Sequence, residues 1–266
     1  MASMHIIRYA LQQQVYYGIV EEGGGIARLE SGPFEGLRRS GVRDAPDAVR
    51  ILTPVAMPRV FGLGYNYVAH SQEVGKKTPS LPILFMKPST AVIGPDDAIV
   101  YPSWGENIHF EGELVVVIGK RARHVAEADA LDYVLGYTCG NDISDRVLQR
   151  RESEFGCLMA GKGYDTFAPL GPAIVTGLDP SCLRIVTRVN GVVRQDGNTA
   201  DLLFSVPYLI AYLSRHLTLL PGDMIMTGTP AGVGPIQVGD RIEVEIAGIG
   251  VLRNDVVADT LPGDVG

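Results

Sequence analysis

Two glutamates stand at the start of the most apolar run in the sequence. Glu111 and Glu113 lead into residues 114–118, within the stretch HFEGELVVVIGK. The run is mostly β-branched and ends at Gly119, a pattern typical of a strand that is buried on both faces. Residues i and i+2 of a strand point the same way, which would place the two carboxylates side by side, with Cα atoms about 6–7 Å apart. Two like charges beside a dry core are unfavourable unless a positive group joins them. If the strand begins in solvent, both are hydrated, and this stretch alone leaves both interpretations open.

A third carboxylate follows another strand-like segment, in GYTCGNDISDR. Asp142 lies there in a turn flanked by Gly and Asn, where functional side chains often occur. Together with two glutamates it would give an all-oxygen ligand set, which suits Mg²⁺ or Mn²⁺ with further positions left to water and substrate. The alternative is an Asx-turn or an N-cap for a helix that begins near Ser144. For this residue alone, the cap is the commoner role.

A histidine and a glutamate share one helical turn in NYVAHSQEVG. His70 and Glu73 are spaced i, i+3, so Glu73 could orient and polarise His70 as a base. The Gly-, Lys- and Pro-containing residues 75–79 that follow indicate a mobile segment, as a lid over a site would be. A surface His and Glu on a solvated turn is the alternative.

Four further polar residues are candidates for substrate contacts. Arg146 and Gln149 share a helix face and could bind a substrate carboxylate, although a solvated face also explains them. Lys162 lies between glycines and could supply positive charge to an enolate, or it could be a surface lysine. Thr229, within residues 227–234 (TGTPAGVG), adds a hydroxyl and backbone N–H groups that could bind an anion. That stretch lacks the lysine of a P-loop, which argues against nucleotide binding.

Composition excludes several classes of protein. The 266 residues include 23 Lys and Arg against 30 Asp and Glu, for a net charge of −7, which argues against nucleic-acid binding. No apolar stretch is long enough to span a membrane, and no signal-peptide pattern is present, so we expect no membrane association and a cytoplasmic location. Three widely spaced cysteines without a C-x-x-C pair argue against a disulfide framework or a thiolate zinc site.

The elements that must position these residues are mostly strands. Residues 1–53 contain short strand-like pieces, and the prolines at 54 and 58 predict a boundary between a small β-rich N-terminal unit and a catalytic domain over 54–266. Beyond it, many short apolar runs are bounded by Gly and Pro, which predicts strands joined by turns. Helical patterns are few, and they cover residues 125–136, 144–153 and 203–217. The sequence therefore predicts a β-rich α+β fold.

Seven motifs in a fixed order, between Val60 and Val257, resemble the fumarylacetoacetate hydrolase family. They are GLGYNYVAHSQEVG, PILFMKPSTAVIGP, HFEGELVVVIGK, GYTCGNDISDRVLQ, GKGYDTFAPLGPAIV, VNGVVRQDGNTADLLF and LLPGDMIMTGTPAGVGP. The resemblance implies a mixed β roll with few helices, like the C-terminal domain of that family, preceded by a variable N-terminal unit. It also implies a homodimer.

The resemblance implies three groups of site residues. The ligands of Mg²⁺ or Mn²⁺, with Ca²⁺ also compatible, would be Glu111, Glu113 and Asp142. The catalytic residues would be His70 and Glu73, on a closing lid, and Lys162. The residues that hold the carboxylate or diketo oxygens of the substrate would be Arg146, Gln149 and Thr229. Many members have Arg before the Asn of the first motif, where this chain has Tyr65, so the resemblance leaves the distal end of the substrate unspecified.

The implied activity is hydrolysis of a C–C bond in an acylpyruvate-like 2,4-dioxo acid, through a metal-bound enolate and a water activated by His70. Isomerisation or decarboxylation of a 2-hydroxymuconate-type diacid, as in a 2-hydroxyhepta-2,4-diene-1,7-dioate isomerase, or decarboxylation of oxaloacetate would pass through the same enolate and stays an alternative. A non-catalytic metabolite-binding protein on this fold is a third class. Its expected signature is loss of a metal carboxylate or of the His–Glu pair, and neither is lost.

Overall fold

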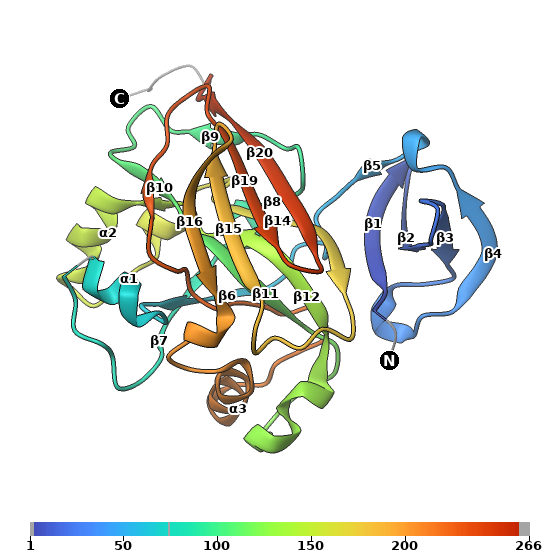
Figure 1. The fold of residues 1–266 in the computed structure, drawn as a ribbon, viewed down its shortest axis with the longest axis horizontal. Helices are drawn as coiled ribbons and strands as arrows, with labels where there is room; N and C mark the ends of the chain where they lie inside the picture. Colours follow the sequence, from blue (N-terminus) through green and yellow to red (C-terminus); the bar gives the residue numbers. More distant parts are fainter. Residues whose placement is uncertain (1–2, 74, 261–266) are drawn as a thin grey trace.

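The computed structural model describes residues 3–73 and 75–260. A twelve-stranded sheet forms the centre, in the order β4-β3-β2-β1-β14-β12-β11-β17-β6-β7, with β5 paired to β1 and β8 paired to β14 (Figure 1). Its strands are β1 (His5–Leu11), β2 (Gln14–Val20), β3 (Ile26–Leu29), β4 (Arg39–Asp44), β5 (Arg50–Ile51), β6 (Val60–Gly64), β7 (Ile83–Lys87), β8 (Val92–Ile93), β11 (Gly112–Ile118), β12 (Val134–Asn141), β14 (Ala168–Val175) and β17 (Met224–Met226).

Two smaller sheets complete the β structure. A five-stranded sheet contains β16 (Val192–Asn198), β15 (Arg184–Val189), β19 (Arg241–Ile246), β20 (Gly250–Ala258) and β9 (Ile99–Tyr101). A three-stranded sheet contains β13 (Ser144–Asp145), β10 (Ile108–Phe110) and β18 (Gly234–Pro235). The described α-helices are α1 (Val68–Glu73), α2 (Arg146–Ser153) and α3 (Val206–His216), and none of them is long and apolar enough to cross a membrane. The α+β, β-rich fold predicted from the sequence is confirmed.

The core explains why β11 is so apolar. Leu114 and Val116 pack into one cluster with Ile185 and Val244 of the five-stranded sheet, whereas Val115 and Val117 face a second cluster on the opposite side. Every residue of β11 is buried. The strand is therefore buried on both faces, as its sequence predicts.

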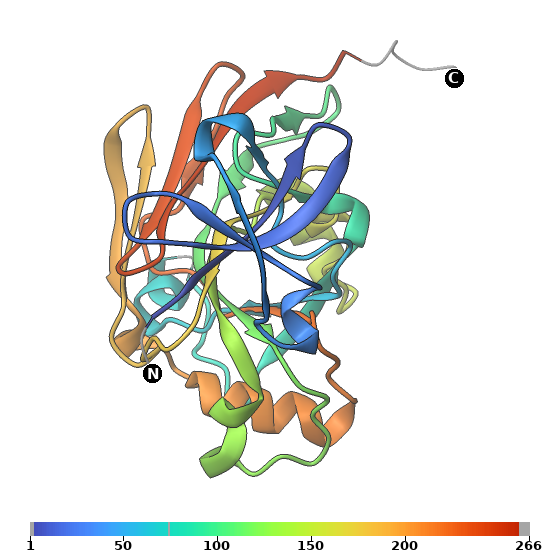
Figure 2. The ribbon, with the colours of Figure 1, turned by 90° about the vertical axis from the view of Figure 1, so that its right-hand side faces the viewer.

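The N-terminal strands extend the central sheet. β1 pairs with β2 along its whole length, and its first residues pair with β14, with Ile6 opposite Ile174. Figures 1 and 2 show β1–β4 as a curled lobe beside the rest of the chain. The division at residue 53 stays a prediction, and the first two and last six residues of the predicted units lie outside the described residues.

Two helical patterns form as predicted and one does not. Ser205 caps α3 by accepting a hydrogen bond from the Tyr208 N–H, and Pro207 lies in the first turn, where it starts the helix without kinking it. The helical pattern over 125–136 is wrong in its second half. Residues Glu127–Tyr133 form a short 3₁₀ helix, η4, and Val134 begins β12 because pairing with β11 satisfies its backbone in the sheet.

Candidate active site

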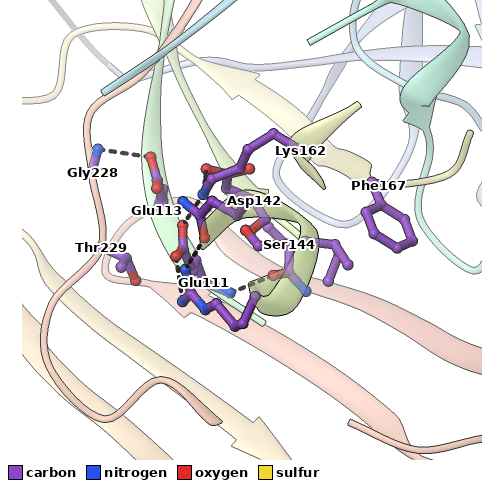
Figure 3. A network of polar contacts seen from close by, with 12 residues as sticks. Glu111, Glu113, Asp142, Ser144, Lys162, Phe167, Gly228 and Thr229 are labelled. Atoms are coloured by element: carbon purple, nitrogen blue, oxygen red, sulfur yellow. Dashed lines mark hydrogen bonds and ion pairs between the residues drawn. The ribbon is translucent and has the colours of Figure 1, made fainter. Parts of the chain in front are cut away.

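The three predicted carboxylates meet at one end of the central sheet. β11 and β12 are antiparallel neighbours with Gly112 opposite Asn141, so the end of β12 lies beside the start of β11. The Asp142 N–H donates to the carbonyl oxygen of Glu111 at 2.8 Å. Ligand oxygens of Glu111, Glu113 and Asp142 all lie within 4.8 Å of one another (Figure 3). All three side chains are buried, so the interpretation of two solvated glutamates is wrong.

The alternative role for Asp142, a helix cap, belongs to a different residue. Asp145 precedes α2, and its Oδ1 accepts hydrogen bonds from the N–H groups of Val147 and Leu148, each at 3.0 Å. Asp142 therefore does not cap the helix, and its carboxylate points toward those of Glu111 and Glu113 (Figure 3).

Buried cations bind two of the three carboxylates. Lys162 Nζ lies 2.8 Å from Glu111 Oε2 and 2.6 Å from Asp142 Oδ2. Arg146 Nη2 lies 2.5 Å from Glu111 Oε1. Both cations are largely buried, and a buried ion pair requires such close geometry to offset its loss of hydration.

Lys87, in the motif PILFMKPSTAVIGP, is a third buried cation, for which no role was predicted from the sequence. Its Nζ lies 2.7 Å from Asp142 Oδ1 and also donates to the carbonyl oxygens of Ile143, Phe167 and Lys162. The side chain is fully buried, and this burial lowers its pKa in spite of Asp142. A lysine that ends an apolar strand and is followed by Pro is the signal that could have identified it.

The carboxylates differ in how well their charges are compensated. Burial opposes ionisation of Glu111, but Arg146 and Lys162 outweigh it and hold the pKa of this carboxyl below its ordinary value. Burial also raises the pKa of Asp142, although its neighbouring lysines act against the rise. For Glu113, burial and the like charges of Asp142 and Glu111 together raise the pKa well above its ordinary value.

Glu113 also has a free ligand atom. Its Oε2 accepts a hydrogen bond from the Gly228 N–H at 2.7 Å, whereas its Oε1 is buried and has no hydrogen-bond partner among the described residues. A buried carboxylate oxygen without a partner is unfavourable unless a cation binds it. Three carboxylates within one small volume offer the all-oxygen set that Mg²⁺, Mn²⁺ and Ca²⁺ prefer. The residues present therefore fit a divalent metal ion.

The predicted catalytic pair lies next to this centre. His70 Nδ1 is 3.1 Å from Glu73 Oε2, and Glu73 Oε1 accepts from the Gly232 N–H at 2.9 Å. Because an ionised carboxylate can only accept, Nδ1 donates in this pair, and in the neutral ring Nε2 is left available to accept a hydrogen bond. The ring of Tyr65 stacks on His70, with centroids 6.3 Å apart.

An inner cavity of about 20 Å³ collects most of the predicted site residues. Its lining includes His70, Glu111, Arg146, Gln149, Lys162 and Thr229. Glu113 and Asp142 complete the triad with Glu111, and Glu73 joins through His70. The structure thus brings all nine predicted residues together, and their roles stay predictions.

An outer hollow of about 490 Å³ shares Tyr65, His70, Arg146 and Gln149 with the inner cavity. Its other lining residues include Lys76 and Arg150, so its wall is rich in positive charge. The Arg146 Nη1 donates to Gln149 Oε1 at 2.9 Å, which leaves the Gln149 amide N–H groups free to donate elsewhere.

Two family models match the chain. The fumarylacetoacetate (FAA) hydrolase C-terminal model matches residues 59–257, and the model described as Rv2993c-like, N-terminal, matches residues 4–54. The triad and its three cations all lie within the first match.

Proteins that are named for different activities are similar to this chain in sequence or in structure. The human mitochondrial oxaloacetate tautomerase FAHD2A is 42% identical over 220 residues, which make up 79% of this chain and 70% of that protein. A 5-carboxymethyl-2-hydroxymuconate delta-isomerase from Mycobacterium smegmatis superposes with a TM-score of 0.90 at 42% identity, over 96% of this chain and 100% of the other. A fumarylpyruvate hydrolase from Pseudomonas aeruginosa, solved with Mn²⁺ and pyruvate, gives a TM-score of 0.74 at 37% identity, over 79% and 92%.

Proposed function

The chain belongs to the fumarylacetoacetate hydrolase family, and we propose that it is a divalent-metal-dependent enzyme that converts a 2-oxo acid by way of an enolate. The unpartnered, buried Oε1 of Glu113, beside two further carboxylates, is the observation that carries the proposal. A divalent cation bound there would act as a Lewis acid on the carbonyl group of the substrate.

The residues around the triad supply the remaining functions. Arg146 and the free amide N–H groups of Gln149 face the inner cavity and can bind the carboxylate of a 2-oxo acid. Lys162 brings a positive charge to the same cavity, where negative charge develops on the enolate oxygen. His70, held by Glu73, accepts a proton at Nε2.

Hydrolysis of an acylpyruvate is the reaction that we propose first. His70 would take a proton from water as the water oxygen bonds to the distal carbonyl carbon of the substrate. The C–C bond then breaks, and its electron pair passes to the pyruvate enolate, which takes up a proton to give pyruvate. The distal acyl group leaves as a carboxylic acid. The fumarylpyruvate hydrolase of P. aeruginosa supports this candidate, because it was solved in complex with Mn²⁺ and pyruvate.

Tautomerisation, isomerisation or decarboxylation of a dicarboxylic oxo acid is the second candidate. Lys76 and Arg150 in the outer hollow favour a substrate with a second negative charge at its distal end. The human oxaloacetate tautomerase and the M. smegmatis isomerase also support it. In tautomerisation or isomerisation His70 would take a proton from one atom of the substrate and return it to another. In decarboxylation CO₂ would leave, the electron pair of the broken bond would pass to the enolate, and the enolate carbon would take up a proton. No water would attack in any of these reactions.

Turnover of two substrates separates the candidates. Acetylpyruvate and oxaloacetate are supplied with Mg²⁺ or Mn²⁺ to the wild type, to His70→Ala, and to His216→Ala, an exposed histidine at the end of α3. For the hydrolase we expect acetylpyruvate cleavage that falls by about 10²–10⁴-fold in His70→Ala only. Oxaloacetate conversion with acetylpyruvate untouched would favour the second candidate. Inactivity on both substrates, with no Mn²⁺ binding, would overturn the proposal.

A further inference from the structure

We infer that Gln195 is a positioning residue of the metal centre, which ties the Glu111–Glu113 strand to the loop that carries Thr229. The inference rests on the proposed function, because it concerns the carboxylates assigned there to a metal ion. Gln195 lies in the motif VNGVVRQDGNTADLLF, to which neither the sequence analysis nor the proposed reaction gives a role. It belongs to β16 of the five-stranded sheet, far from the triad in sequence.

The side chain of Gln195 joins two segments of the site. Its Oε1 accepts a hydrogen bond from the Gly112 N–H at 3.0 Å, and its Nε2 donates to Thr229 Oγ1 at 2.6 Å and to the Pro230 carbonyl oxygen at 2.8 Å. Gln195 has no exposed surface, so water does not compete for these bonds. Gly112 is the residue between the two glutamates, which places the contact at the centre of the proposed ligand strand.

The chemistry of the neighbours fixes the orientation of the amide. The Gly112 N–H can only donate and the Pro230 carbonyl can only accept, so the amide oxygen must face Gly112 and the nitrogen must face Pro230. Thr229 Oγ1 therefore receives an N–H from Gln195. Its own proton goes to the Gly112 carbonyl oxygen, 2.9 Å away. Gly112, Gln195 and Thr229 thus close a ring of hydrogen bonds in which each donor and acceptor is determined.

This ring acts on Glu113 through the next residue of the loop. The Gly228 N–H, adjacent to Thr229, donates to Glu113 Oε2 at 2.7 Å and leaves Oε1 directed away from that bond (Figure 3). Gly112 has no room for a side chain, because a Cβ there would lie 2.1 Å from Thr187 Oγ1 of β15, so the backbone packs closely against the five-stranded sheet at this point. Outer partners that hold metal ligands in place commonly change metal affinity by about 10–100-fold when they are replaced.

The ring also determines what Thr229 can recognise. Because the hydroxyl donates its hydrogen bond to the Gly112 carbonyl oxygen, it can act toward any further partner only as a hydrogen-bond acceptor. A substrate hydroxyl, such as that of an enol, or a water molecule can donate to it, whereas a carboxylate or keto oxygen cannot accept a hydrogen bond from it. The Thr229 hydroxyl is therefore suited to a different group from the carboxylate or diketo oxygens that the family resemblance implies.

The test is Mn²⁺ binding by calorimetry on the full chain, without substrate. Gln195→Glu keeps the shape but replaces the donating amide nitrogen with an oxygen, and Gln237→Glu is the matched change at an exposed position. We expect Mn²⁺ affinity to fall by about 10–100-fold in Gln195→Glu and to be unchanged in Gln237→Glu. A folded Gln195→Glu protein that binds Mn²⁺ within twofold of the wild type would overturn the inference, even if its melting temperature were lower.

Thr229→Val and Thr229→Ser decide the question if Gln195→Glu does not fold. Valine removes the hydroxyl at nearly constant size, so we expect weaker Mn²⁺ binding, whereas serine keeps the hydroxyl and should restore it. Equal affinity in the valine variant and the wild type would contradict the ring. A wild type that fails to bind Mn²⁺ would overturn the proposed function itself, which makes the two failures distinguishable.

Discussion

Two sites at which buried carboxylates meet cations, one in the N-terminal lobe and one at the triad, differ among the described residues in how completely their oxygen atoms are bound. In the N-terminal lobe, Asp44 accepts a hydrogen bond from the Tyr9 hydroxyl at 2.5 Å and two from Arg28, at 2.6 and 2.9 Å. The Arg28 guanidinium also lies over the ring of Tyr16, 3.8 Å from its centroid. Both carboxylate oxygens are thus bound, and Arg28 holds the pKa of Asp44 below its ordinary value against the effect of burial.

The triad and its cations have equal numbers of positive and negative side chains, three lysine or arginine residues to three carboxylates, yet not every carboxylate oxygen is bound by a described residue. Glu111 and Asp142 bind all the cations, and Glu113 receives only a backbone N–H. The pKa of Glu113 is accordingly raised, whereas that of Asp44 is lowered. The distribution of charge, rather than its sum, therefore distinguishes the two sites: of the two, only the triad has a buried carboxylate oxygen without a hydrogen-bond partner in the described part of the chain.

Removal of Lys87 should have the largest effect on the fold. Lys87→Met leaves Asp142 and three carbonyl oxygens without their cation, so we expect the free energy of unfolding to fall by about 3–5 kcal/mol. Urea unfolding measures this, with the exposed Lys120→Met as a control that should change it by less than about 0.5 kcal/mol. A loss below about 1 kcal/mol in Lys87→Met would show that the ionic cluster does not hold the centre together.

Glu113→Gln should separate binding from stability. The amide resembles the uncharged carboxyl that burial favours, so without metal the free energy of unfolding should stay constant or rise. Mn²⁺ affinity should fall by about 100-fold or more, because the substitution removes a proposed metal ligand. Replacing a residue that only holds a ligand in place already lowers metal affinity by about 10–100-fold. Denaturation without metal and calorimetry with Mn²⁺ give the two values. A Glu113→Gln protein that is less stable than the wild type but binds Mn²⁺ equally well would show that Glu113 stabilises the fold and does not bind the metal.

Asp44→Asn should lower the stability of the protein and leave Mn²⁺ affinity unchanged, which is the opposite of the result expected for Glu113→Gln. It removes charge-assisted hydrogen bonds to Arg28 and Tyr9, so we expect a loss of about 2 kcal/mol in unfolding free energy and no change in Mn²⁺ affinity. The pKa of Asp44 is lowered by folding, so its contribution is complete above about pH 4 and is lost as the pH falls through the lowered value. The wild type and Asp44→Asn should therefore differ in stability at pH 6 and converge in acid. A constant difference between the two would contradict this origin.

The sequence predicts much of the site because its strongest signals are local. A β-branched run with glutamates two residues apart places Glu111 and Glu113 on one face of a buried strand, and the order of motifs adds Asp142. The i, i+3 spacing likewise brings His70 and Glu73 into contact. The fold class and the family are confirmed, and the roles of these residues stay predictions that the experiments above address.

Other features depend on partners that are distant in the sequence. Lys87 donates hydrogen bonds to carbonyl groups 56 to 80 residues away, and Gln195 contacts Gly112 across 83 residues. No local pattern records such pairings. The prediction of a helix over 125–136 was wrong for a related reason. The segment has a helical pattern, but from Val134 onward it pairs with the neighbouring strand β11.

The separation of the outer hollow from the buried triad has an evolutionary consequence. Lys76 follows α1, His109 lies on β10 and Arg150 lies on α2, whereas the triad is built around β11 and β12 of the central sheet. Within the described residues, Lys76 and Arg150 are not among the cations bound to the carboxylates, unlike Arg146, which also lines the hollow. Substitutions at these two positions can therefore change the charge of the hollow over evolutionary time while the triad keeps its partners.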